Sequence, residues 1–199
     1  MQAARMFARS LDEEGKRVQC HRVTTELFGS LGATGAGHGS PKAIILGLQG
    51  EAPDTVDIEG IEARISEVRE GGEILLMGTH AISFSYRDDL IMHRTETLPF
   101  HSNGMRFTAY DDQGRPLHTR VYYSVGGGFV VDESASEGDV IVDDPTPVRY
   151  PFSSAEELLA QCREYGLSIS SLMLANEQAW RTEAEVREGL LALWKVMDA

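Results

Sequence analysis

A histidine set among small residues is the first candidate for chemistry in this 199-residue chain. His38 lies in the stretch GSLGATGAGHGSPKAIILGL, residues 29–48, where Gly, Ala and Ser dominate. Small residues let a backbone approach a ligand closely and adopt positive φ angles. An imidazole can act as a general base or a ligand near neutral pH. His38 is therefore a candidate catalytic residue, and the alternative is a loop histidine that bonds a backbone carbonyl.

A second candidate site is the stretch LPFHSNGM, which holds His101 and Asn103. Its Pro and Gly residues predict a loop just ahead of a strand. Loops held by rigid strands often carry reactive residues, although many loop histidines are simply solvated. We treat His101 as a candidate catalytic residue and Asn103 as a candidate binding residue.

A third candidate is the triple glycine Gly126, Gly127 and Gly128 in YYSVGGGF. Three glycines between strands can form an anion-binding nest, or only a β-bulge and turn. The stretch lacks the Gly-Lys-Ser/Thr of a phosphate loop and does not open a helix as a dinucleotide fingerprint does. Phosphate binding is not predicted.

Metal ligation by this chain is not predicted. Cys20 and Cys162 are too few and too far apart to hold a zinc ion or an iron–sulfur cluster. The other four histidines lack a ligand spacing such as H-x-x-x-H, and we interpret them as core or surface residues: His21, His80, His93 and His118.

Hydrophobic periodicity predicts strands interleaved with helices first and helices alone last. Two alternating runs, residues 105–110 and 117–124, are joined by the polar turn DDQGRP and predict an antiparallel hairpin, with a further strand at 129–131. Helices are predicted at 1–14, 41–48 and about 61–70, and strand character follows at 73–86. Residues 132–152 read as an exposed acidic connector.

Three helices are predicted after that connector, because each segment opens with Ser or Thr ahead of an apolar periodicity. Large apolar residues recur there at helical spacing and are predicted to pack between these helices. They are Leu172, Trp180, Leu190, Leu191, Leu193 and Trp194.

Composition excludes several function classes. A net charge of −13 disfavours contact with the phosphate backbone, so no nucleic acid is expected as partner. No apolar run approaches the roughly 20 residues that span a bilayer, and no signal peptide is visible. We therefore expect a cytoplasmic protein that does not contact a membrane.

Together, three separated motifs resemble the N-terminal β domain of iron–sulfur-dependent L-serine dehydratase, the L-serine ammonia-lyase, in its single-chain form. The motifs are ELFGSLGATGAGHGSPKAIILGLQGEAPDTVD, LPFHSNGMRFTAY and YYSVGGGFVVDE. The family domain is an α+β unit, similar to the allosteric substrate-binding domain of some phosphoglycerate dehydrogenases. The resemblance implies a mixed or antiparallel sheet with helices on one face, followed by C-terminal helices.

The resemblance also implies roles for particular residues. The histidine of the family's Gly-x-Gly-His motif falls on His38, and that of its Pro-x-His-x-Asn-Gly-Met motif falls on His101. Both are implicated at a site between domains, and either could be the base. Asn103 and the glycines from Gly126 to Gly128 would line a substrate or effector pocket. The family deaminates L-serine to pyruvate and ammonia with a 4Fe–4S cluster, whose ligands would not lie in this chain.

The resemblance further implies a division at residue 150. Residues 1–150 would be the β domain, truncated at its N-terminus, and residues 151–199 the linker and first helices of the catalytic α domain. Ser40 and Pro41 stand where the family usually has Thr-Asp. We expect a fragment, inactive alone, of a homodimeric enzyme. The alternatives are a serine-binding regulatory or dimerisation module without catalytic residues, or a purely structural domain.

Overall fold

The computed structural model describes residues 1–133 and 146–198. The chain divides into two compact units, Met1–Ile141 and Val142–Ala199, and each is described by itself. The connector expected at residues 132–152 lies largely outside the described residues.

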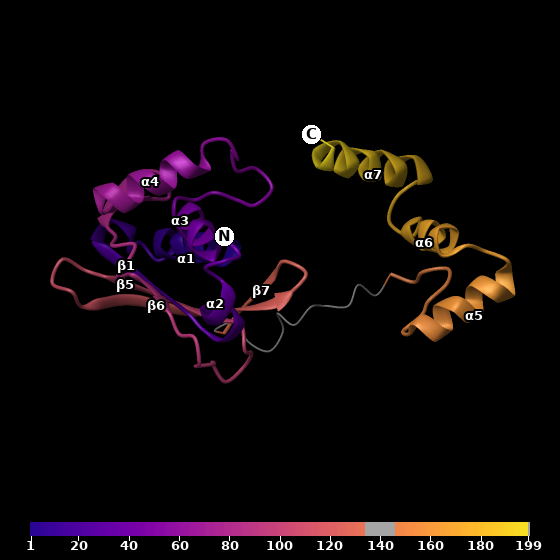
Figure 1. Ribbon diagram of the computed structural model, residues 1–199, viewed down its shortest axis with the longest axis horizontal. Coiled ribbons are helices and arrows are strands. Elements are labelled where there is room, and N and C mark those ends of the chain that lie inside the picture. The colour runs from indigo at the N-terminus through magenta and orange to yellow at the C-terminus, as the bar shows by residue number, and fades with distance from the viewer. Residues whose placement is uncertain (134–145, 199) are drawn as a thin grey trace. The chain divides into compact units, whose positions relative to one another are not determined.

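The described part of the first unit contains one mixed sheet of seven strands (Figure 1). Its order is β2-β3-β1-β5-β6-β7, and β4 also pairs with β1. β1 runs antiparallel to β5 and parallel to β3 and β4. The strands are β1 (Arg22–Leu27), β2 (Glu73–Leu76), β3 (His80–Ser83), β4 (Leu90–Met92), β5 (Gly104–Tyr110), β6 (Pro116–Gly126) and β7 (Phe129–Asp132).

The hairpin predicted from alternation is confirmed as the antiparallel pair β5–β6. Asp111 shapes its turn, because its carboxylate accepts hydrogen bonds from the backbone N–H groups of Gln113 and Arg115. The strand predicted at 129–131 is β7, which pairs with β6. The predicted strand character at 73–86 is divided between β2 and β3, because Met77 and Gly78 adopt φ angles of +52° and +70° and reverse the chain.

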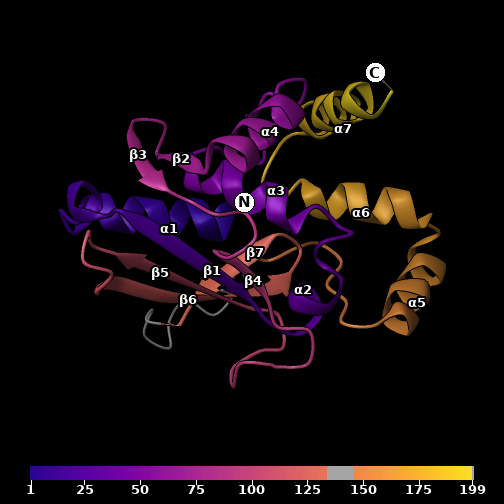
Figure 2. The same ribbon diagram turned by 60° about the vertical axis from the view of Figure 1, so that its left-hand side comes forward.

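Helices cover one face of this sheet (Figure 2), and the predicted α+β class is confirmed. Phe7 of α1 is fully buried, and its ring stacks on that of Phe107 in β5 with centroids 5.3 Å apart. α1 ends before Gly15, whose φ of +65° a helix cannot contain. The described helices of this unit are α1 (Gln2–Glu13), the 3₁₀ helix η1 (Arg17–Gln19), α2 (Gly29–Thr34), α3 (Ser40–Leu48) and α4 (Ile61–Gly71).

The second unit contains the three predicted helices, α5 (Ala155–Tyr165), α6 (Ile169–Glu177) and α7 (Glu183–Met197). Their predicted N-caps are confirmed: the side chains of Ser154, Ser168 and Thr182 each accept a backbone N–H from the first turn. No helix in the described ranges is long and apolar enough to cross a membrane.

The predicted apolar packing between these helices is largely wrong. Leu172 is buried, but the side chains of α7 predicted to pack are exposed, with 57% of Trp194 and 60% of Leu190 accessible. Trp180 is 47% exposed. A helix that is apolar on most of its surface is typical of the core of a larger domain.

Candidate functional site

The short helix α2 links the two segments that carry the predicted histidines. The small residues from 29 onward were expected to let the backbone approach a ligand closely, but Gly29–Thr34 form a helix. A Cβ on Gly29 would lie 1.8 Å from the carbonyl oxygen of Ser102, and one on Gly32 would lie 2.1 Å from that of His93. The glycines therefore allow α2 to contact residues 93–104, here called the Asn103 loop, backbone against backbone.

Backbone hydrogen bonds fix the Asn103 loop at several points. The His93 N–H donates to the Leu27 carbonyl at 2.8 Å, and the Phe28 N–H donates to that of Gly104 at 2.9 Å. The Gly29 N–H donates to the Glu96 carbonyl at 2.7 Å. The loop is thus attached to the end of β1 and to the start of α2.

His101 is half-buried in this loop. The backbone N–H of Asn103 donates to its Nδ1 at 3.1 Å. Nδ1 is then an acceptor, and in the neutral ring the proton lies on Nε2. His101 therefore presents an N–H donor to a ligand, rather than a free lone pair.

Asn103 supplies the complementary group. Its side-chain Oδ1 is buried and has no hydrogen-bond partner among the described residues. A buried carbonyl oxygen without a partner costs about 1–3 kcal/mol, so it favours a ligand that carries an N–H donor. The backbone of Asn103 is held to β6, because the Ser124 N–H donates to its carbonyl at 2.9 Å.

His38 lies in the turn between α2 and α3 and is exposed. Its backbone N–H donates to Gly35 at 3.1 Å, and Gly39, with φ of +76°, then starts α3. No contact of its imidazole is found in the part of the chain that the structure describes, so its lone pair is available. α2 is about 9 Å long. The two histidines thus flank one short helix, and no contact between their rings is found within the described ranges.

The triple glycine forms the tip of the β6–β7 hairpin, with φ angles of +100°, +58° and +82° at Gly126, Gly127 and Gly128. The sequence left open an anion-binding nest or a β-bulge and turn, and the observed geometry is that of a bulge and turn. Gly128 lines a cavity of about 240 Å³, but Gly126, Gly127, His38, His101 and Asn103 do not. Most of the cavity lining is apolar: Met1, Gln2, Ala3, Leu27, Leu31, Ser40, Ala43, Ile44, Pro53, Met105, Ser124, Gly128 and Val130.

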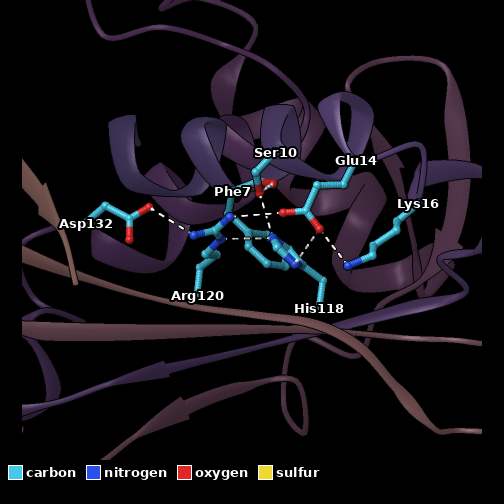
Figure 3. A network of polar contacts seen from close by, with 7 residues as sticks. All are labelled: Phe7, Ser10, Glu14, Lys16, His118, Arg120 and Asp132. Carbon is cyan, nitrogen blue, oxygen red and sulfur yellow. Dashed lines mark hydrogen bonds and ion pairs between the residues drawn. The ribbon is translucent and has the colours of Figure 1, made fainter. Parts of the chain in front are cut away.

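His118, which was interpreted from the sequence as a core or surface residue, is buried at the centre of a polar network (Figure 3). His118 Nε2 lies 2.9 Å from Ser10 Oγ and accepts a hydrogen bond from Arg120 Nε at 3.2 Å. His118 Nδ1 lies 3.3 Å from Glu14 Oε2. Burial of the ring lowers the pKa of His118.

The Ser10–His118–Glu14 order resembles that of a hydrolase triad, but the electrostatics oppose that chemistry. A triad histidine must become an imidazolium with a proton on Nε2. Here the Arg120 guanidinium points a donor at that atom. We interpret the network as a structural link between α1 and β6. Its sequence signal is the period of two that places His118, Arg120 and Tyr122 on one face of β6.

The residues that the structure describes do not fit an iron–sulfur cluster. Across residues 1–133 and 146–198, no group of three or more His, Cys, Asp or Glu side chains could hold a metal ion. Cys20 is buried, and that burial raises the pKa of its thiol to about 11, which disfavours the thiolate that a cluster requires. Cys162 is also buried and belongs to the other unit.

The structure is thus an α+β domain in which the turn that holds His38 and the Asn103 loop lie next to the same short helix, α2. Residues 1–135 match the family model described as serine dehydratase beta chain. The chain belongs to this family.

Curated relatives agree with this assignment. The chain is 55% identical to the L-serine dehydratase of Streptomyces coelicolor over 199 residues, which cover 100% of the chain and 44% of the relative. It is 43% identical to that of Mycobacterium bovis, with 99% and 42% covered, and 40% identical to L-serine dehydratase 1 of Escherichia coli, with 100% and 43% covered. The chain thus spans less than half the length of these relatives.

Proposed function

We propose that this chain is the β-domain portion of an L-serine dehydratase, which eliminates water from L-serine and releases pyruvate and ammonia. Its family and its relatives' names support this activity. Residues 1–150 are the β domain, and residues 151–199 lead into the α domain of the same enzyme. The exposed apolar side chains of α7 support that division, because a further domain would bury them.

One observation carries the substrate assignment: the unpartnered Oδ1 of Asn103 lies two residues from a histidine that presents an N–H. An amino acid zwitterion offers an ammonium donor and a carboxylate acceptor. Asn103 Oδ1 accepts a hydrogen bond from the ammonium, and His101 Nε2–H donates to the carboxylate. Neither interaction requires the protein to change its hydrogen bonding.

His38 is the general base of the proposal. The elimination removes the α-proton and the β-hydroxyl of serine, and the aminoacrylate then hydrolyses to pyruvate and ammonia. A base needs an available lone pair, which His38 has and which the Nδ1 of His101 has already committed to Asn103. His38 therefore takes the α-proton and His101 binds substrate.

The described residues of this chain do not fit the 4Fe–4S cluster that the family resemblance implies. Its ligands are assigned to the α domain. We also propose that the full-length enzyme is a homodimer and that it is located in the cytoplasm.

The test is serine deamination by the full-length enzyme that contains this chain, reconstituted anaerobically. Asn103→Ala and His101→Phe should each raise KM about tenfold with kcat changed less, because they remove ground-state binding. The exposed His21 provides a matched control, His21→Phe, which should leave both constants unchanged. Unchanged KM in both loop variants would contradict the substrate assignment.

A further inference from the structure

We infer that His93 is a positioning residue for the Asn103 loop, which it holds through two carboxylates so that His101 and Asn103 face one ligand. The inference rests on the proposed function, since it names how the same binding loop is kept in place. His93 itself is not assigned any contact with the substrate.

The two ring nitrogens of His93 contact carboxylates from different elements. Nε2 lies 2.9 Å from Glu26 Oε1 on β1, and Nδ1 lies 3.3 Å from Glu96 Oε1 on the loop. His93 thus joins an exposed loop side chain to the sheet. Glu96 is 67% exposed at its side chain, and its contact with His93 is the one that ties this side chain to the sheet in the described structure.

Stacking on an aromatic ring also holds the His93 imidazole in place. Its ring stacks on Phe28 with centroids 4.5 Å apart and an interplanar angle of 12°. Phe28 is buried, and the Arg106 guanidinium lies over its ring at 5.2 Å. Arg106 also contacts Glu26 Oε2 at 3.3 Å. Glu26 therefore uses one oxygen for Arg106 and the other for His93, which fixes the orientation of both.

Backbone hydrogen bonds connect the residues around His93 to the segment that carries His101 and Asn103. Phe28, on which His93 stacks, donates its N–H to Gly104, the residue after Asn103. Gly29, the next residue, contacts both Glu96 and Ser102. A shift of His93 would therefore move both ends of the segment that carries His101 and Asn103.

The first measurement is hydrogen exchange of residues 97–103 in the full-length enzyme. His93→Phe keeps the stacking on Phe28 but removes both ring-nitrogen contacts with the carboxylates of Glu26 and Glu96. It should raise exchange in the loop at least several-fold, with unchanged circular dichroism, whereas His21→Phe should not. Unchanged loop exchange in His93→Phe would overturn the inference. This readout does not depend on serine turnover, so it separates failure of the inference from failure of the proposed function.

The second measurement is a double-mutant cycle on serine deamination. His93→Phe should raise KM about tenfold, His93→Gln less, because its amide can still donate to one carboxylate. If His93 acts through Asn103, the variant with both His93→Phe and Asn103→Ala should lose little more than Asn103→Ala alone. Losses that multiply in the double variant would show that His93 acts independently, and would overturn the inference.

Discussion

The carbonyl oxygen of Ser102 occupies the space where a Cβ of Gly29 would lie, at 1.8 Å. Gly29 also has a φ of +58°, which L side chains rarely adopt. Together with the approach of Gly32 to the His93 carbonyl, this contact sets how closely α2 packs against the Asn103 loop. Gly29 is therefore a residue that the close packing of α2 against this loop requires.

Gly29→Ala should therefore lower the free energy of unfolding by more than about 3 kcal/mol, through both backbone strain and displacement of Ser102. Gly15→Ala separates the two effects, because Gly15 has a similar φ of +65° and nothing within 4 Å of its would-be Cβ. That control should cost about 1 kcal/mol. Urea unfolding followed by circular dichroism measures both, and equal losses would contradict the close-contact argument.

His118 should make stability depend on pH. Burial lowers its pKa in the folded state, whereas the unfolded chain binds a proton near the ordinary histidine pKa of about 6.5. Between these two values the unfolded state holds more protons, so stability falls as the pH decreases from about 7 and stops falling below the folded pKa. Urea unfolding midpoints measured at pH values below about 7 test whether stability falls as the pH decreases.

His118→Gln should remove much of this pH dependence, and the exposed His21→Gln should leave it in place. The Gln variant should also cost about 1–3 kcal/mol at neutral pH, because the contacts with Ser10 and Glu14 are perturbed. A pH profile that is the same in His118→Gln and the parent would assign the effect to other groups.

Core packing between α1 and the sheet should dominate the stability of the first unit. Phe7→Ala removes a fully buried ring and should cost about 3–5 kcal/mol. Phe129→Ala, at a ring that is 56% exposed, should cost less than about 1 kcal/mol. Comparable losses in the two variants would contradict the burial assigned to Phe7.

The α7 surface should respond differently in two contexts. Trp194 is 57% exposed in this chain, so Trp194→Glu should change its stability by less than about 0.5 kcal/mol. In the full-length enzyme the proposed α domain buries Trp194, and the same change should cost about 3 kcal/mol or more. Thermal unfolding of both proteins decides, and a small effect in both would contradict the proposed domain division.

Patterns that depend on neighbouring residues were predictable from the sequence. The alternation at 105–110 and 117–124 gave the β5–β6 hairpin, and Ser154, Ser168 and Thr182 marked the helix starts. Candidate residues on loops, such as His101 and Asn103, were identified because Pro and Gly surround them.

Long-range partners were not predictable. Gly29 and Gly32 were expected to allow close approach to a ligand, because the sequence does not show that Ser102 and His93 lie against them. His118 was interpreted only as a core or surface residue, because its contacts Ser10 and Glu14 are more than 100 residues away in the sequence. The exposure of Trp194 was missed because helical spacing indicates that a face is apolar but not which surface covers it.

The most direct test of the account is the kcat for serine deamination by the reconstituted full-length enzyme with His38→Ala, beside wild type and His21→Ala. The account predicts a loss of about 10²-fold or more in kcat for His38→Ala alone, because it removes the proposed base. An unchanged kcat with altered serine cooperativity would contradict it, and would instead make this domain a regulatory module.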